Sequence, residues 1–341
     1  MLRDRLAKAL DATRVTQALL HLAPLRPRSR VTLLTYHRVT MPVPTYPFDS
    51  EVVDATPSEF DQQLADLAKY AHVVGVTELR ELVEAGKAPP NTVAITFDDG
   101  YKECVDVVLP MLQRHGLRAT FFVATGNVTE RRLFWWDRIA YALKRAKTQR
   151  FTLSYPKPME VDASDPARAF KPLADSVKGT PWLDVERFVD ELTEKSGAPW
   201  SRELERKYAD ELLMTWDDLR TLRKAGMDVQ SHTRSHRVLP TLSLDEMVTE
   251  FQSSKEDLER ELGETPFALA YPCGRIGKEL PVIREAATRT GYKLGFSNAS
   301  GVNAPSWDAL NLGRVAMERG MSAAMFRGML AVPSLWYHNA K

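Results

Sequence analysis

Cysteine is nearly absent from this 341-residue sequence, which holds two, Cys104 and Cys273. A framework of several disulfides is therefore excluded, and the packing of apolar side chains must hold the fold together. The sequence also has no unbroken apolar run long enough to cross a membrane. Basic and acidic residues nearly cancel, at 46 and 45, so the charge gives no reason to expect nucleic acid as the main partner.

Residues 1–30 lack the continuous apolar stretch of a signal peptide, because charged residues such as Lys8 and Asp11 interrupt their leucines. We therefore expect a cytoplasmic protein. The leucines fall near helical spacing with basic residues between them, which predicts an amphipathic helical segment. Two interpretations stay open for it. The helix docks on the protein's own surface, or it makes peripheral contact with an anionic membrane at the inner membrane face.

Apolar runs of strand length alternate with segments of helical length along most of the chain, from a strand at 31–37 to one at 311–317. This alternation predicts an α/β fold with a parallel sheet, either open or closed into a barrel. Residues 38–55 hold three prolines, and we interpret them as a loop. Residues 126–214 break the rhythm and predict an inserted helical or irregular subdomain that ends in two helices.

Candidate functional side chains stand at the ends of four predicted strands: His37, Asp98, Asp99, His232 and Cys273. In a parallel barrel the carboxyl ends of the strands meet on one face, and catalytic residues gather there. A single such residue is usually structural, as a cap or a satisfied polar group. Five of them at four strand ends favour a functional site.

Two short segments of the chain together contain the residue types of one metal site. Asp98 and Asp99 are adjacent at a strand end, and His232 and His236 are four residues apart after another strand. One aspartate with two histidines makes a three-ligand shell for a zinc-like divalent ion, with one position open for water. The other aspartate is then a candidate base. On composition alone the two carboxylates are interchangeable, and the set predicts a hydrolase.

The same motifs carry a resemblance to a known family. TFDDG at 96–100, HTRSH at 232–236 and AYPCG at 270–274 resemble the signatures of polysaccharide deacetylases with the NodB-homology domain, carbohydrate esterase family 4. The resemblance covers about 31–125 and 215–320. It implies a distorted (β/α) barrel of about seven strands, with residues 31–341 forming the deacetylase domain around the insertion.

The resemblance also implies a separate role for each residue of the site. It implies that Asp98 is the catalytic base and that Asp99, His232 and His236 hold a divalent metal ion. Zinc is the expected ion, although such a shell suits several metals. A protonated group must donate to the leaving amine, because an amide anion is a very poor leaving group. His37 resembles the acid of a permuted subgroup, whereas His338 lies nearer that motif's place in other members.

One departure from the family pattern concerns its third motif, which usually carries an arginine that holds the base. Ala270 stands at that position here. Arg314, on a later strand, is a candidate substitute, and a core-edge salt bridge is the alternative for it. Cys273 replaces the motif's tyrosine, whose backbone N–H is the oxyanion donor, so this role can survive; a small buried thiol is the alternative. Tyr271 beside it is a further candidate for substrate binding.

Trp135 and Trp136 open the insertion and are candidates for stacking against a sugar ring, because a pyranose has an apolar C–H face. Neighbouring residues do not easily share one face, so we expect at least one of the two to belong to the core.

Together these inferences predict a metal-dependent de-N-acetylase of an N-acetylated amino sugar in a polysaccharide or a lipid-linked glycan. A cytoplasmic enzyme of this kind would act on an intermediate in exopolysaccharide biosynthesis. Three alternatives stay open: an amidohydrolase of the same fold with a non-polymeric substrate, an O-deacetylase, and a glycan-binding homologue without activity. The complete ligand set and base argue against the last, and the missing arginine argues for it.

Overall fold

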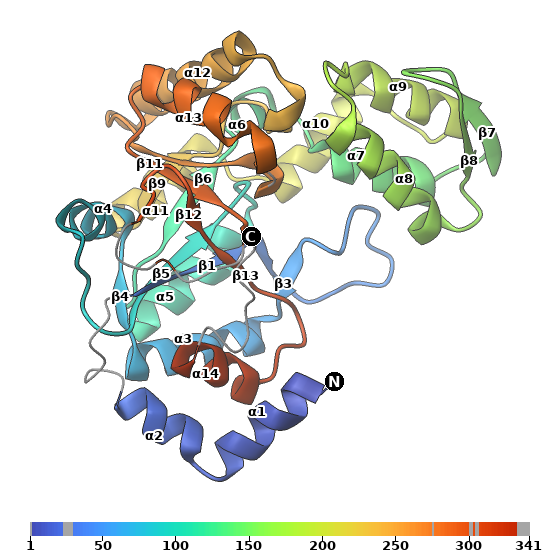
Figure 1. Ribbon diagram of the computed structural model, residues 1–341. Coiled ribbons are helices and arrows are strands. Elements are labelled where there is room, and N and C mark those ends of the chain that lie inside the picture. Colours follow the sequence, from blue (N-terminus) through green and yellow to red (C-terminus); the bar gives the residue numbers. More distant parts are fainter. Residues whose placement is uncertain (1, 23–29, 275, 300–302, 304–306, 333–341) are drawn as a thin grey trace.

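Residues 2–22, 30–274, 276–299, 303 and 307–332 are described by a computed structural model of the chain (Figure 1). At the centre of this part lies a nearly closed barrel of eight parallel strands surrounded by helices, which confirms the predicted α/β barrel fold. The expected count of about seven strands is one too low. The order around the barrel is β12 (Leu312–Gly313), β11 (Leu294–Ser297), β10 (Ala268–Ala270), β9 (Asp228–Ser231), β6 (Thr120–Val123), β5 (Thr92–Phe97), β1 (Val31–Tyr36) and β13 (Val315–Ala316).

The two strands at the heart of the barrel are buried along their whole length. Every residue of β1 and β5 is buried, and the two strands pair over six consecutive residues. One face of each strand packs inside the barrel and the other packs under helices, so both faces are buried. A further strand, β4 (His72–Val74), pairs with β5 outside the circular path.

One short stretch near the C-terminal end of the chain, residues 312–316, brings the barrel to near closure. β12 pairs with β11 at one edge, and β13, one residue later, pairs with β1 at the other edge. Arg314 is the residue between these two pairings. Its backbone N–H still donates to the Ser297 carbonyl, at 2.9 Å. The expected strand at 311–317 is therefore two short strands with an arginine at the joint.

Helices cover the outside of the barrel, and several begin where the sequence predicts. Thr56 caps the first of them in a capping box with Glu59. A single helix was expected over 101–115, but a π-helical turn, Cys104–Val108, precedes a shorter α-helix. Pro110 explains the change, because it has no N–H to donate to the preceding turn. The helices are α3 (Pro57–Tyr70), α4 (Val76–Ala85), α5 (Leu109–His115), α11 (Trp216–Lys224), α12 (Leu244–Leu262), α13 (Leu280–Arg289) and α14 (Ala323–Ala331).

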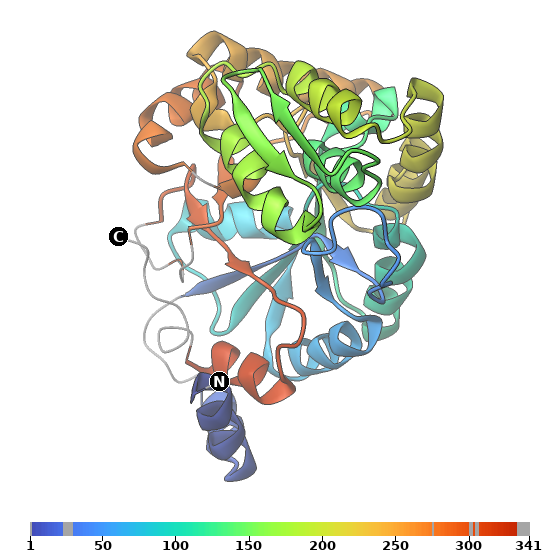
Figure 2. The same cartoon turned by 90° about the vertical axis from the view of Figure 1, so that its right-hand side faces the viewer.

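The segment 126–214 contains more regular structure than expected. It ends in two helices as predicted, but a β-hairpin and further helices precede them. The segment has its own apolar core, which includes Leu143, Phe188 and Leu192. It stands in front of the barrel in Figure 2 (green). Its elements are α6 (Thr125–Glu130), α7 (Trp135–Lys144), β7 (Arg150–Leu153), β8 (Met159–Asp162), α8 (Pro166–Gly179), α9 (Val185–Ser196) and α10 (Arg202–Leu212).

Residues 38–55 are not loop throughout, as we expected. They contain β2 (Arg38–Val39) and β3 (Val53–Ala55), which pair with each other in parallel. The three prolines lie between these two short strands, where no backbone N–H is needed for pairing. The small sheet carries the chain from the end of β1 across the mouth of the barrel.

The N-terminal residues form two helices, α1 (Leu2–Ala12) and α2 (Val15–His21), separated by Arg14 in the left-handed conformation. Both lie against α14, at the end of the molecule away from the inserted segment (Figure 1). Ion pairing fixes this contact, because Arg327 of α14 bonds to the Asp11 carboxylate. Among the described residues, no helix combines the length and the apolar character needed to span a membrane.

Candidate metal centre and active site

The predicted site residues meet in one cavity of about 220 Å³ at the carboxyl ends of the barrel strands. The barrel contributes both aspartates, both histidines of the HTRSH segment, His37 and Cys273 to its lining, and the inserted segment contributes α7 and α8. This is the arrangement that the strand-end pattern predicts.

Adjacent Asp98 and Asp99 reach the same cavity because the backbone turns sharply after β5. Successive side chains of a strand point to opposite faces. Here Asp99 has a φ of 74° and Gly100 a φ of 98°, so two consecutive residues are left-handed. A Cβ atom at Gly100 would also lie 3.2 Å from the Val123 side chain. A glycine tolerates this turn, while the strained Asp99 is held by its surroundings.

A loop, not a helix, sets the four-residue spacing of His232 and His236. Residues 232–238 have no regular helix, and His236 has a φ of 53°. Glu250 of α12 anchors the loop: its carboxylate accepts the backbone N–H of Arg234 at 3.0 Å and of Ser235 at 2.8 Å. This carboxylate therefore holds the backbone of the loop between the two histidines.

Asp99, His232 and His236 offer three ligand atoms to one point. Asp99 Oδ1 lies 3.5 Å from His232 Nε2 and 3.4 Å from His236 Nε2, and all three atoms lie within 4.8 Å of one another. Tetrahedral coordination at bonds of about 2.0 Å separates ligand atoms by roughly 3.3 Å, so the spacing fits a zinc-like ion.

The protonation of these groups favours a cation as well. His232 Nδ1 faces the Ala270 carbonyl at 2.9 Å, which assigns the proton to Nδ1 and leaves the lone pair of Nε2 directed at Asp99. Asp99 Oδ1 is buried with no hydrogen-bond partner among the described residues. Burial and the neighbouring His232 lower the pKa of His236 to about 3, so its imidazole is neutral. A neutral imidazole and an unpartnered carboxylate oxygen facing one another are suited to share a cation.

Asp98, in contrast, is held by an arginine. Arg314 donates two hydrogen bonds of 2.7 Å, one to each carboxylate oxygen of Asp98, and a third of 3.0 Å to Asn298. Both partners of the pair are buried. Burial alone would raise the pKa of Asp98, but the Arg314 charge outweighs it and lowers this pKa to about 2. Arg314 therefore contacts the predicted base, as the missing arginine of the third motif was expected to do.

His37 follows β1 and is paired with a carboxylate that the sequence analysis missed. Its Nδ1 lies 3.0 Å from Asp54 Oδ2, and its backbone N–H donates to the same oxygen at 2.5 Å. Burial disfavours the imidazolium, but the Asp54 charge outweighs burial and raises the pKa of His37 to about 10. The pair forms because β2 and β3 bring residues 37 and 54 together. The apolar neighbours of Asp54, Val53 and Ala55, were the signal for that strand.

Two residues of the third motif, Cys273 and Tyr271, lie in different places. Cys273 lines the cavity and adopts a φ of 57°, the left-handed region. Tyr271 is fully buried, and its hydroxyl donates to the Leu310 carbonyl at 2.7 Å. The structure thus brings Cys273 to the metal-binding residues but places the Tyr271 side chain in the core, and substrate contact by that side chain has no support.

Both tryptophans of the insertion line the cavity, and they differ in their contacts. Trp136 donates from Nε1 to the Tyr101 hydroxyl at 3.0 Å and packs edge-on against the His236 ring, with centroids 4.7 Å apart. Trp136 therefore packs against one of the candidate ligand histidines. Trp135 lies under the Lys178 ammonium, 5.7 Å from the ring centroid, and is the better placed of the two to face a ligand.

Lys178, Phe170 and Asn298 also line the cavity and were not predicted. The first two come from α8 and nothing in the sequence links them to the motifs. The competing acid candidate, His338, lies outside the described residues.

Comparisons with known proteins identify the family of the chain. A family model described as polysaccharide deacetylase matches residues 85–171 and 175–295. The match covers more than half of the chain and runs through most of the inserted segment, which the motifs alone had left outside the resemblance. The chain belongs to the polysaccharide deacetylase family, a group of hydrolases that act on amide bonds of glycans.

Individual relatives are distant. YxkH of Bacillus subtilis (strain 168), which carries the polysaccharide deacetylase name, is 26% identical over 113 residues, 33% of this chain and 39% of its own length. The Streptococcus pyogenes deacetylase PplD in complex with acetate superposes with a TM-score of 0.58 at 20% identity, over 87% of this chain and 96% of that one. IcaB from Ammonifex degensii gives 0.57 at 19%, over 89% and 97%. At this identity the two structures support the fold alone.

Proposed function

We propose that the protein is a metal-dependent de-N-acetylase of an N-acetylated amino sugar within a polysaccharide or a lipid-linked glycan. The observation that carries the proposal is the buried group of Asp99, His232 and His236, with Asp98 beside it and His37 in the same cavity. Family membership supports the reaction type. We expect the ion to be zinc, given one carboxylate and two imidazole ligands. Such an ion supplies Lewis acidity, which polarises the acyl carbonyl and makes water more acidic.

Asp98 is the proposed base. Arg314 keeps its carboxylate ionised, so it is available to take a proton from the attacking water at neutral pH. The two hydrogen bonds from Arg314 also fix the plane of the carboxylate. Because Asp98 is engaged by Arg314 and Asp99 faces the two histidines, the two adjacent carboxylates have different roles.

His37 is the proposed acid. Asp54 keeps the imidazole protonated, so a proton is available for the nitrogen of the leaving amine. Without this donation the C–N bond would break toward an amide anion. Nδ1 points at Asp54, which leaves Nε2 as the atom that donates.

Cys273 is proposed to contribute its backbone N–H as a donor to the oxyanion. The residue lines the cavity next to the ligand histidines, and this donor does not depend on the side chain. We further propose that Trp135 faces the sugar ring, since its indole lines the same cavity.

The N-terminal helices support a further proposal, that the enzyme works at the inner face of a membrane. Leu6, Val15 and Leu22 are 52%, 42% and 55% exposed on α1 and around α2, near exposed basic residues. Exposed apolar side chains that alternate with basic ones along the sequence suit contact with an anionic bilayer. Binding to vesicles with anionic lipids, lost in Leu6→Asp and absent with neutral vesicles, would support this proposal. Binding that does not depend on Leu6 would contradict it.

Acetate release tests the main proposal. The protein is incubated with oligomers of N-acetylglucosamine, with and without a chelator, and acetate and free amine are measured. We expect both products in equal amounts, loss of both with chelator, and recovery when zinc is added back. Acetate without amine, from an O-acetylated substrate, would identify an O-deacetylase. Tight oligomer binding without any product would identify a glycan-binding protein.

A further inference from the structure

A second and larger cavity, of about 490 Å³, lies beside the metal-binding cavity. One wall is the loop after β9, and the opposite wall is the turn between α8 and α9 of the inserted segment. Trp135 and His236 line both cavities, so the two meet at these side chains. A volume of this size lies within the roughly 300–1,000 Å³ of small-molecule sites. A ligand that is long enough can therefore occupy both cavities at once.

Trp182 stands on the wall formed by the inserted segment and is 72% exposed. Its φ of 54° is left-handed, a conformation that is rare for a bulky residue. Its backbone N–H donates to the Thr241 carbonyl of the barrel at 2.9 Å, which ties the tip of the inserted segment in place. The backbone of Trp182 is thus held in a strained conformation while its indole stays exposed. This arrangement gives an apolar surface that is already in place before a ligand binds.

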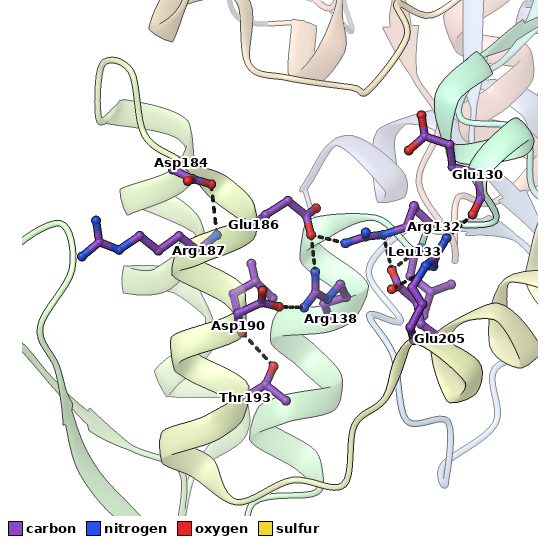
Figure 3. A network of polar contacts seen from close by, with 12 residues as sticks. Glu130, Arg132, Leu133, Arg138, Asp184, Glu186, Arg187, Asp190, Thr193 and Glu205 are labelled. Atoms are coloured by element: carbon purple, nitrogen blue, oxygen red, sulfur yellow. Dashed lines mark hydrogen bonds and ion pairs between the residues drawn. The ribbon is translucent and has the colours of Figure 1, made fainter.

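Most of the charged side chains around this cavity form ion pairs. Glu130 bonds to Arg234 at 2.9 Å. Glu186 bonds to Arg132 and, at 2.8 Å, to Arg138 (Figure 3). Asp184 accepts the Arg187 backbone N–H at 3.1 Å and so caps α9. The cavity therefore offers many polar atoms, and its three acidic and three basic lining residues cancel in formal charge. Such a surface favours a neutral ligand with hydroxyl and amide groups over a polyanion or a polycation.

We infer that this second cavity binds the neighbouring sugar units of a neutral N-acetylated glycan whose reacting unit lies at the metal-binding residues, with Trp182 stacked on a pyranose face. The inference rests on the proposed function. An aromatic face for C–H groups, surrounded by paired polar groups for hydroxyls, matches the chemistry of a sugar chain. The enzyme therefore acts on oligomers or polymers in preference to single sugars.

Chain-length dependence tests the inference. kcat/KM is measured on the shortest N-acetylglucosamine oligomer that is turned over and on longer ones. We expect kcat/KM of the wild type to rise with oligomer length. We expect Trp182→Ala to reduce the ratio of kcat/KM on long oligomers to kcat/KM on short ones about ten-fold, through a higher KM for the long oligomers. Trp182→Tyr keeps most of the ratio, because it keeps an aromatic face. Met41→Ala, which removes a comparably exposed apolar side chain that lines neither cavity, leaves this ratio unchanged. An equal loss of kcat/KM on oligomers of all lengths in Trp182→Ala would overturn the inference.

Binding separates this inference from the proposed chemistry. Affinity for the same oligomers is measured by calorimetry in Asp98→Asn with and without Trp182→Ala, both loaded with zinc. Length-dependent binding that needs Trp182, together with no acetate release by the zinc-loaded wild type on any oligomer, would support the second cavity and contradict the deacetylase. Acetate release that depends neither on length nor on Trp182 would support the deacetylase and overturn the role of the second cavity.

Discussion

Arg314 and Asp98 form a buried bidentate ion pair, with both hydrogen bonds at 2.7 Å. The arginine reaches Asp98 from the joint between β12 and β13, where the chain passes from one edge of the barrel to the other. The family's usual arginine position is occupied by Ala270. Asp98, the proposed base, is therefore held from the stretch of chain that brings the barrel to near closure, and we propose that Arg314 compensates for the arginine that the third motif lacks.

Replacing Arg314 by lysine tests this compensation. A lysine keeps the charge but cannot form the two parallel hydrogen bonds, so the Asp98 carboxylate loses its fixed orientation. We expect kcat/KM to fall ~10–100-fold. Since Arg314 lowers the pKa of Asp98, weaker pairing raises that pKa, and the acidic limb of the pH profile moves to higher pH. Wild-type kcat/KM with an unmoved acidic limb would show that Arg314 is only a core salt bridge.

The acid is tested by His37→Gln beside His338→Gln. We expect the His37 change to reduce kcat about 100-fold or more, because the leaving amine loses its proton donor, with metal content unchanged. We expect His338→Gln to retain activity. Loss of turnover in His338→Gln alone, with the metal retained, would reverse the assignment.

Asp54→Asn tests how His37 stays protonated. Asp54 raises the pKa of His37, so removing its charge lowers this pKa and the imidazole loses its proton at lower pH. We expect the alkaline limb of kcat/KM to move down by about one pH unit or more, with activity below the limb largely kept. Asp49→Asn is the matched control, because Asp49 lines the same cavity but accepts the Glu51 backbone N–H at 3.0 Å. An alkaline limb that moves equally in both variants would contradict the His37–Asp54 pairing.

Cys273→Ala separates the thiol from the backbone. If the residue contributes its N–H, alanine keeps that donor, and we expect kcat/KM to stay within about three-fold of the wild type with full metal content. Loss of metal in this variant, measured by elemental analysis, would make the thiol a ligand instead. Cys104→Ala serves as the control for the loss of a thiol elsewhere, since Cys104 is buried in the core.

Local sequence patterns predicted the barrel and the grouping of Asp99, His232 and His236 because both depend on short segments. Asp98, Asp99 and His232 stand directly at strand ends, and the position of a strand end follows from the apolar run before it. The four-residue spacing to His236 was readable as well. The loop geometry and its anchor, Glu250, were not, because they depend on a helix that begins eight residues after His236.

Contacts between segments that are distant in the chain could not be predicted from the sequence. Asp54 reaches His37 only through the pairing of β2 and β3, and three prolines between them had suggested a plain loop. The partner of Arg314 was undecided because the arginine and Asp98 are 216 residues apart. Trp182 and α8 approach the site through tertiary packing of the inserted segment, for which no periodic pattern gives a direction.

The division of labour between two adjacent aspartates is the central claim, and metal content measured beside acetate release tests it most directly. Asp98→Asn and Asp99→Asn remove one charge each without a change of size. We predict that Asp98→Asn keeps the metal and loses acetate release by ~100-fold or more, whereas Asp99→Asn loses both. Metal loss in Asp98→Asn, with metal retained in Asp99→Asn, would contradict the assignment of base and ligand.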